Sequence, residues 1–428
     1  MESSNETRLL QGILDEAAKG DGKVALEPRR YRCGTLTLPS GIHLHLPEGC
    51  VLQASTEERD YPVLGSTYNE TGEMQALLFA EHAETITLSG KGTIQGTGTE
   101  ALRWQEAADL PFRPETILFR DCRNVRMEDL TLRDSSFWTV HLLRCDDVDL
   151  HRLTIRNRLD RINTDGIDPD GCRRVRIRDC DIEAGDDGIV LKSTEGDPVE
   201  DVSIANCRLR TPCAALKIGT ETFGDITGIH FADCTILDSN MAFGIFLKDG
   251  GSIDEILAEN LTIESPGEFP LFIDHTPRFE GESKEGRLGS IILRDLRITS
   301  PGRLFVQGGY ATRLEHLRLD RIEWRIPYPL QLAQAGKPPG SARSRPPARK
   351  TLPQHEPFQL CLANIDDFRC TRLSFVTEDG TLPQGRGLLY AEATSGSFED
   401  CELPPVHPDC TEPVKRRHCE QLSLPLGK

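Results

Sequence analysis

Three aspartates in two short glycine-containing segments are the residues whose types and spacing could do chemistry. The segments NTDGIDPD and GDDGIVLK align when Gly166 is matched with Gly188. This alignment puts Asp165 and Asp187 at one equivalent position, and Asp186 directly precedes the second of them. If the two segments lie side by side in the fold, three carboxyl groups converge on one face.

Carboxyl groups held this close repel one another when ionised, which raises the pKa of at least one of them. A carboxyl group of this kind remains a proton donor near neutral pH. Glycoside hydrolysis uses one carboxylic acid to protonate the leaving oxygen and a second carboxylate to activate water or attack the sugar. From the spacing alone, two other interpretations stay open: a solvated acidic ladder and a calcium site in a turn.

The elements that must position these aspartates form a sequence repeat. Segments of the type VRMEDLTL, with apolar residues at the first, third, sixth and eighth positions and usually Asn or Asp at the fifth, begin at residues 125, 148, 175, 202, 229, 256 and 291. Two alternating pairs around a polar break predict two short strands joined by a bend, not a helix. Stacked coils of roughly 22 to 30 residues, about ten in number, indicate an all-β fold of the parallel β-helix type.

The same pattern predicts the organisation of the whole chain. We expect residues 1–428 to form one domain, because a stack of coils needs no further division. The segment LLQGILDEAAKG predicts a short N-terminal helix that caps the open end of the first coil. Residues 326–359, rich in Pro and basic residues, are expected to be a loop inserted between coils, and residues 404–428 an irregular C-terminal tail.

Half of the 14 cysteines follow the repeat. Four occupy its sixth position and three lie three residues before its start: Cys180, Cys207, Cys234, Cys401, Cys122, Cys145 and Cys172. The sequence contains no CxxC pair, the spacing that is typical of zinc sites. We therefore expect these thiols to be small fillers of the interior and not disulfides or metal ligands.

The charge of the chain limits its partners. Its 68 acidic and 50 basic residues leave a formal net charge of -18, which argues against nucleic-acid binding because phosphate recognition needs an electropositive face. No apolar stretch is long enough for a membrane span, and the first residues lack a signal-peptide pattern. We expect a cytoplasmic protein, or an extracellular or periplasmic one if a signal peptide was removed. The oligomeric state is left open.

The ordered motifs resemble those of family 28 glycoside hydrolases, the polygalacturonase family. NTDGID, the following GDD, GKGTIQG and SSFWTVHLLRCDDVDL look like that family's landmarks. The resemblance implies a right-handed, pectin-lyase-like parallel β-helix and an inverting reaction on an oligosaccharide. It also implies Asp186 as the general acid, with Asp165 and Asp187 holding and activating the water. No cofactor and no metal are implied.

The chain departs from the family at two motifs. The histidine of a Gly-His-Gly segment falls on Ala214 in CAALKIGT, and the arginine of an Arg-Ile-Lys segment falls on Phe246, so that only Lys248 remains. Loss of a bidentate arginine is costly for a substrate that presents a carboxylate. Matching Gly244 with Ala215 in the same alignment would put Phe243 opposite Ala214.

Six further residues are predicted to bind substrate. Lysines could orient sugar hydroxyls or lower the pKa of a neighbouring aspartate, and two acidic residues could contact hydroxyls. A tryptophan could stack on a sugar, although a buried packing role is open for it. These residues are Lys192, Lys217, Lys248, Asp168, Glu221 and Trp138. A pectin-derived oligosaccharide is the leading substrate. The alternatives are a hydrolase or transglycosylase for a neutral sugar, a non-catalytic carbohydrate-binding β-helix protein, and a polysaccharide lyase.

Overall fold

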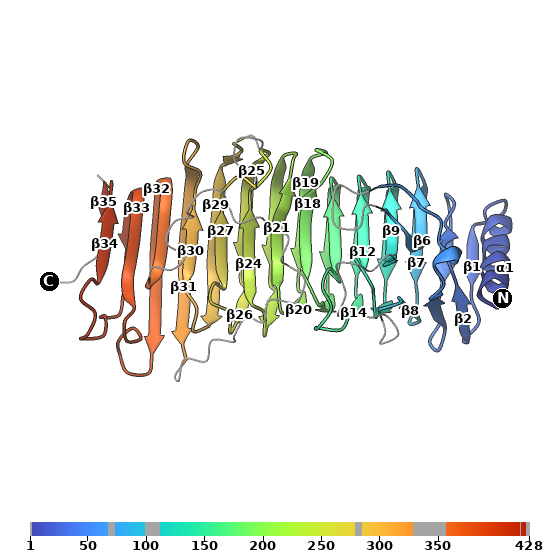
Figure 1. Ribbon diagram of the computed structural model, residues 1–428, viewed down its shortest axis with the longest axis horizontal. Coiled ribbons are helices and arrows are strands. Elements are labelled where there is room, and N and C mark those ends of the chain that lie inside the picture. Colours follow the sequence, from blue (N-terminus) through green and yellow to red (C-terminus); the bar gives the residue numbers. More distant parts are fainter. Residues whose placement is uncertain are drawn as a thin grey trace. The chain divides into compact units, whose positions relative to one another are not determined.

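The computed structural model describes residues 2–66, 73–98, 112–278, 285–327, 357–419 and 421–424. These residues fall into two compact units. Unit 1 takes its described residues from Met1–Thr211, and unit 2 takes its own from Pro212 onward. Figure 1 colours unit 1 from blue to green and unit 2 from green to red. The expectation of one domain over the whole chain stays a prediction.

Unit 1 is built from parallel strands that stack in three columns, and a complete coil contributes one strand to each column. The first column contains β3 (Leu36–Thr37), β6 (Ala76–Glu81), β9 (Glu115–Arg120), β12 (Val140–Leu143), β15 (Ile167–Asp170) and β18 (Ile189–Ser193). The second contains β1 (Lys23–Ala25), β4 (His43–His45), β7 (Glu84–Ser89), β10 (Arg123–Glu128), β13 (Asp146–His151), β16 (Arg173–Arg178) and β19 (Val199–Ala205). The third contains β2 (Arg30–Cys33), β5 (Val51–Ala54), β8 (Thr93–Gln95), β11 (Thr131–Arg133), β14 (Thr154–Arg156), β17 (Asp181–Glu183) and β20 (Arg208–Arg210).

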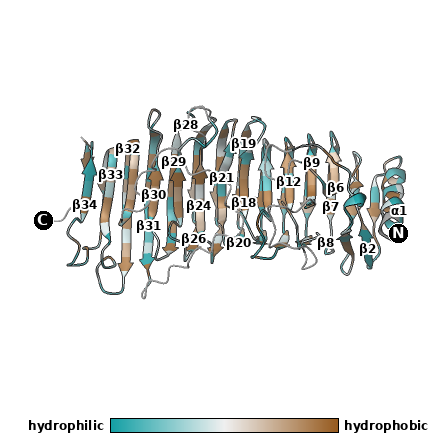
Figure 2. Cartoon of the chain, in the orientation of Figure 1, coloured by the Kyte–Doolittle hydropathy of each residue, from teal (hydrophilic) through white to brown (hydrophobic). Residues whose placement is uncertain are grey.

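Unit 2 repeats this architecture, and several of its strands are longer. Its elements are β21 (Ala214–Thr222), β22 (Ile226–Ala232), β23 (Thr235–Leu237), β24 (Met241–Phe246), β25 (Ser252–Glu259), β26 (Thr262–Glu264), β27 (Leu271–Asp274), β28 (Arg287–Leu288), β29 (Ser290–Thr299), β30 (Leu304–Gln307), β31 (Leu314–Ile326), β32 (Phe358–Thr377), β33 (Gly387–Glu399), β34 (Val414–Arg417) and β35 (Leu422–Ser423). Consecutive coils pair in parallel, as in β21 with β24 and β24 with β27. Figure 2 shows hydrophobic residues along the strands of both units, whereas β34 is hydrophilic. The predicted all-β parallel β-helix is confirmed, and the number of coils stays a prediction.

The repeat explains why each coil bends where it does. Its first position forms an interior ladder, in which Val125 pairs with Val148 and Val148 with Val175, all at most 1% exposed. Its fifth position has a positive φ, for example 64° at Asp129 and 52° at Asn206. Asn and Asp tolerate this left-handed conformation better than most residues, which accounts for their preference at the fifth position.

An N-terminal helix closes the first coil of unit 1, as predicted. Helix α1 (Glu2–Ala17) lies beside β1 in Figure 1 and packs Leu10 and Leu14 inward. Its side chains bind the exposed strand edge: the amide of Gln11 exchanges two hydrogen bonds with the backbone of Thr37, at 2.8 and 2.9 Å. The helix therefore satisfies backbone groups that would otherwise offer a free edge for pairing. None of the helices in the described part of the chain is long and apolar enough to cross a membrane.

The cysteine prediction is confirmed for six of the seven repeat positions. All seven are free thiols, and six are buried: Cys122, Cys145, Cys172, Cys180, Cys207 and Cys234. Cys401 is only half-buried, because it follows the end of β33 in one of the last coils.

Both segments that were expected to be irregular contain strand residues. Of the inserted loop predicted at 326–359, residues 328–356 lie outside the described residues. Its first residue, Ile326, ends β31, and its last two belong to β32. The prediction of an irregular tail at 404–428 is wrong at β34 and β35, which both pair in parallel with β33. These strands cover the edge of the preceding coil, as an unpaired edge requires.

Candidate active site

The two aspartate-bearing segments lie in neighbouring coils of unit 1. Ile167 pairs with Ile189, and the Gly166 N–H donates to the carbonyl of Asp187 at 2.9 Å. A Cβ atom on Gly166 would lie 2.4 Å from the carbonyl oxygen of Gly188, so only glycine allows this approach. The alignment of Asp165 with Asp187 is therefore the register that the structure has.

The three aspartates differ in exposure. Asp165 and Asp187 are each 2% exposed, whereas Asp186 is half-buried and reaches the surface. A carboxylate oxygen of Asp186 accepts a hydrogen bond from the Asn163 N–H at 2.8 Å. The Asn163 side-chain oxygen in turn accepts one from Arg113 at 3.0 Å. Asp186 is thus the carboxyl group best placed to meet a molecule from solvent.

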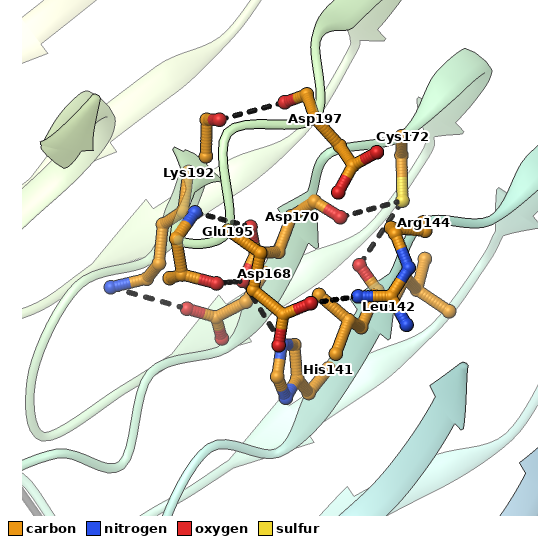
Figure 3. A network of polar contacts seen from close by, with 12 residues as sticks. His141, Leu142, Arg144, Asp168, Asp170, Cys172, Lys192, Glu195 and Asp197 are labelled. Atoms are coloured by element: carbon orange, nitrogen blue, oxygen red, sulfur yellow. Dashed lines mark hydrogen bonds and ion pairs between the residues drawn. The ribbon is translucent and has the colours of Figure 1, made fainter. Parts of the chain in front are cut away.

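Lys192 is an interior residue of unit 1. Its side chain is 6% exposed, and its Nζ lies 3.5 Å from Asp165 Oδ2 and 3.6 Å from Asp168 Oδ1. Asp168 is fully buried, so it has no exposed oxygen for a sugar hydroxyl. Each of the two is an interior partner of the other, and the direct substrate contacts predicted for them stay predictions. Figure 3 shows Lys192 directed at Asp168.

Trp138 is also an interior residue. It is 4% exposed, and its ring is covered by Lys192 Nζ at 4.4 Å from the centroid, by Phe137 at 5.1 Å and by the edge of His141 at 4.7 Å. With these contacts the ring offers no open face to a sugar. This burial favours the packing alternative, and the stacking platform stays a prediction.

A charged triad lies beside this group. His141 Nδ1 is 3.2 Å from both carboxylate oxygens of Glu115, and its Nε2 is 3.4 Å from Asp170 Oδ2. Asp170 also accepts hydrogen bonds from the N–H of Thr194 at 2.8 Å and from its hydroxyl at 2.5 Å. Burial lowers the pKa of His141, yet the charges of Glu115 and Asp170 and the hydrogen bonds to them outweigh it and raise that pKa to about 10. These contacts favour the imidazolium form of His141.

Sequence reasoning missed Glu115 and Asp170. No local spacing connects them with His141, since they lie 26 and 29 residues away along the chain. The signal that would have found them is the coil register. It pairs β12, which carries His141, with β9 and β15, which carry Glu115 and Asp170.

Burial also dominates the electrostatics of the aspartate pair. It raises the pKa of Asp168 to about 7, although the nearby charges of Lys192 and His141 lower it. Burial and the charge of Asp168 raise the pKa of Asp165 well above its usual range, and again Lys192 lowers it. Two carboxyl groups in one desolvated space cannot both ionise at low cost.

In unit 2, two of the predicted lysines lie near one aromatic ring. Lys217 Nζ is 5.3 Å and Lys248 Nζ 6.0 Å from the centroid of Phe246. Lys248 is also bound inside the unit, by an ion pair with Asp274 and a hydrogen bond to the Thr276 hydroxyl at 2.5 Å. Lys248, the lysine that remains of the Arg-Ile-Lys segment, therefore already has an internal carboxylate partner.

Glu221 is buried in unit 2 and contacts Arg278. The Arg278 guanidinium donates to Glu221 at 3.1 Å and to both oxygens of Asp249 at 2.8 and 2.9 Å. Its role in this structure is to hold an arginine, which differs from the hydroxyl contact predicted for it. The sequence alignment is also wrong here by two residues, because Lys217 pairs with Gly244.

One further acidic cluster in unit 1 has the residue types of a metal site. Ligand atoms of Glu81, His82 and Asp121 lie within 4.8 Å of one another. Their carboxylates already pair with arginines, Glu81 with Arg120 and Asp121 with Arg144. This cluster is therefore explained as part of the surface ion pairs between coils.

Comparison with known proteins identifies a family for this chain. Residues 35–297 match the family described as glycosyl hydrolases family 28. A probable polygalacturonase of Vitis vinifera is 27% identical over 286 residues, covering 60% of this chain and 57% of the relative. An endo-polygalacturonase of Pectobacterium carotovorum subsp. carotovorum is 26% identical over 335 residues, covering 73% and 82%. The chain thus spans little more than half the length of the Vitis vinifera relative.

Among solved structures, the family 28 exopolygalacturonase of Yersinia enterocolitica is similar in fold. It has a TM-score of 0.69 and 14% sequence identity, and the match covers 93% of this chain and 76% of the other. At this identity the similarity supports the β-helix and nothing finer.

Proposed function

Because the chain belongs to glycosyl hydrolases family 28, we propose that it is a glycosidase that hydrolyses a pectin-type oligosaccharide. The observation that carries this proposal is the register of unit 1, which puts Asp165, Asp186 and Asp187 in neighbouring coils. A protein that only binds sugar has no need for three close carboxyl groups, whose mutual repulsion destabilises the fold.

The proposed reaction is inverting. Asp186, the half-buried carboxyl group, donates a proton to the leaving oxygen. Asp165 and Asp187 hold a water molecule and accept its proton while its oxygen attacks the anomeric carbon from the opposite face. The glycosidic bond breaks, the sugar leaves with the hydroxyl from water, and the anomeric configuration is reversed. Analysis of the first-formed anomer by NMR checks this stereochemistry.

The test of the proposal is a panel of uronate and neutral oligosaccharides incubated with wild type and Asp186→Asn. Removal of a general acid lowers rates by about 10²- to 10⁴-fold, so we expect a loss of this size in the variant. Asp160→Asn is the matched control, since Asp160 is 59% exposed and pairs with Arg158. Equal hydrolysis by wild type and Asp186→Asn would refute the assignment of the acid.

A hydrolase for a neutral sugar is the second candidate, and one observation favours it. Phe246 stands where the resemblance expects an arginine, and Lys248 is bound to Asp274 and Thr276. A uronate carboxylate would have to compete with Asp274 for this lysine. Hydrolysis confined to the neutral oligosaccharides of the panel would decide for this candidate.

A further inference from the structure

Lys192 is a buried cation with a defined set of partners. It lies on β18 and is 4% exposed. Its ammonium faces the Trp138 ring at 4.4 Å and two carboxylates, those of Asp165 and Asp168, at 3.5 and 3.6 Å. Burying an ammonium group is costly unless opposite charges compensate it, so these contacts keep Lys192 in the interior.

The two carboxyl groups share this one cation. Their side chains are 3% and 0% exposed. Within the described part of the chain, Asp165 Oδ1 and both oxygens of Asp168 have no hydrogen-bond partner. Two ionised carboxylates and one ammonium leave a net negative charge in a desolvated space. One proton on the pair removes that charge and supplies a hydrogen-bond donor that the oxygens lack.

The charged groups around the pair come from each neighbouring element of unit 1. Asp186 and Asp187, before β18, raise the pKa of Asp165, and Asp187 raises that of Asp168. His141 on β12 lowers the pKa of Asp168, and its own charge is balanced by Glu115 on β9 and by Asp170 on β15. Lys192 is the cation that lowers the pKa of both carboxyl groups.

We propose that Lys192 is a positioning residue: fixed against Trp138, its ammonium holds Asp165 beside Asp168 and favours the state in which Asp165 is ionised. This inference rests on the proposed function, in which an ionised Asp165 accepts the proton of the attacking water. Lys192 itself does not touch the substrate. Its removal therefore changes the pH at which Asp165 works, whereas Asp168, a neighbouring negative charge, acts on Asp165 in the opposite direction.

The test compares the pH profiles of kcat/KM for Lys192→Met and Asp168→Asn. The acidic limb of such a profile reports the ionisation of the base in the free enzyme. We expect Lys192→Met to shift the acidic limb to higher pH by at least about one unit. At a given pH on that limb, kcat/KM then falls about tenfold, and it recovers at higher pH. Asp168→Asn should move it downward. General loosening of the site lowers activity at every pH and cannot produce shifts of opposite sign.

Two controls make the comparison specific. Lys192→Arg keeps the cation and should keep the acidic limb near its wild-type position. Lys23→Met removes an exposed lysine, 72% exposed and distant in sequence, and should leave the profile unchanged. If Lys192→Met and Asp168→Asn both leave the limb in place, or move it in the same direction, the proposal is wrong.

A second measurement does not depend on catalysis. Infrared difference titration follows the carbonyl band of protonated carboxyl groups. The absorbance of this band that disappears in Asp165→Asn is assigned to Asp165. We expect this band to persist to higher pH in Lys192→Met than in wild type, and an unchanged titration overturns the proposal. If no glycan is cleaved, the proposed function fails, while this titration still decides the role of Lys192.

Discussion

Replacement of His141 by leucine should destabilise the protein in a pH-dependent way. The imidazole is 1% exposed and lies between Glu115 and Asp170. Its pKa rises from the usual 6.5 to about 10 in the folded protein. At 1.36 kcal/mol for each pKa unit, this corresponds to about 5 kcal/mol of preference for the imidazolium. Burial raises the pKa of Glu115, which offsets part of this gain. We therefore expect His141→Leu to cost about 3 to 5 kcal/mol, as for other broken buried pairs.

The sign of the pH dependence follows from the raised pKa. Because the folded protein holds the proton more tightly than the unfolded chain, the contribution of His141 is complete below pH 6.5 and is lost as the pH rises to about 10. Guanidinium unfolding of wild type and His141→Leu at several pH values, followed by tryptophan fluorescence, measures it. The difference between the two proteins should be largest at pH 6 and should shrink toward pH 10.

His151→Leu is the matched control for this prediction. His151 is equally buried in unit 1, but its carboxylate partners, Glu128 and Asp149, are each 22% exposed. Water solvates carboxylates that it can reach, so removal of the imidazole beside them costs less free energy of unfolding. We expect the control to cost less than His141→Leu at pH 6. A cost for His141→Leu that equals the control, or that does not change between pH 6 and pH 10, would refute the reasoning.

Two further predictions concern unit 2. Asp274→Asn removes the internal carboxylate partner of Lys248. It should lower KM for a uronate oligosaccharide by about tenfold and leave KM for a neutral one unchanged. Equal effects on both substrates would contradict a role of Asp274 in specificity. Hydrogen bonding with the Cys370 thiol lowers the pKa of Cys401 to about 7, so this half-buried thiol should react fastest with iodoacetamide at pH 7. Cys401→Ser should abolish the fast phase, Cys410→Ser should not, and a fast phase that persists in Cys401→Ser would show the assignment to be wrong.

Much of the fold of unit 1 was predictable because its determinants are local. Alternating apolar residues set which face of each strand is buried, and Asn or Asp at the fifth position accepts the left-handed bend. The same regularity predicted that Asp165 and Asp187 align, since Gly166 and Gly188 mark the same point of consecutive coils.

The register of unit 2 was harder to predict. The aligned segments of unit 2 match Ala215 with Gly244 and not two glycines, and β21 is a strand of nine residues, longer than β18, a strand of five. A shift of two residues keeps the same faces of the strands inward, so the hydrophobic pattern cannot detect it. Lys217 consequently pairs with Gly244, where the alignment had placed it two positions away.

The amino-acid sequence by itself determined the coil, the bends and the presence of three neighbouring aspartates, because these depend on residues that are close in the chain or one repeat apart. Only the tertiary structure decided what each charged side chain faces. Lys192 faces Asp165 and Asp168, and Lys248 faces Asp274. Whether a lysine meets solvent, substrate or a buried carboxylate depends on how long side chains pack between coils, and that packing leaves no periodic signal in the sequence.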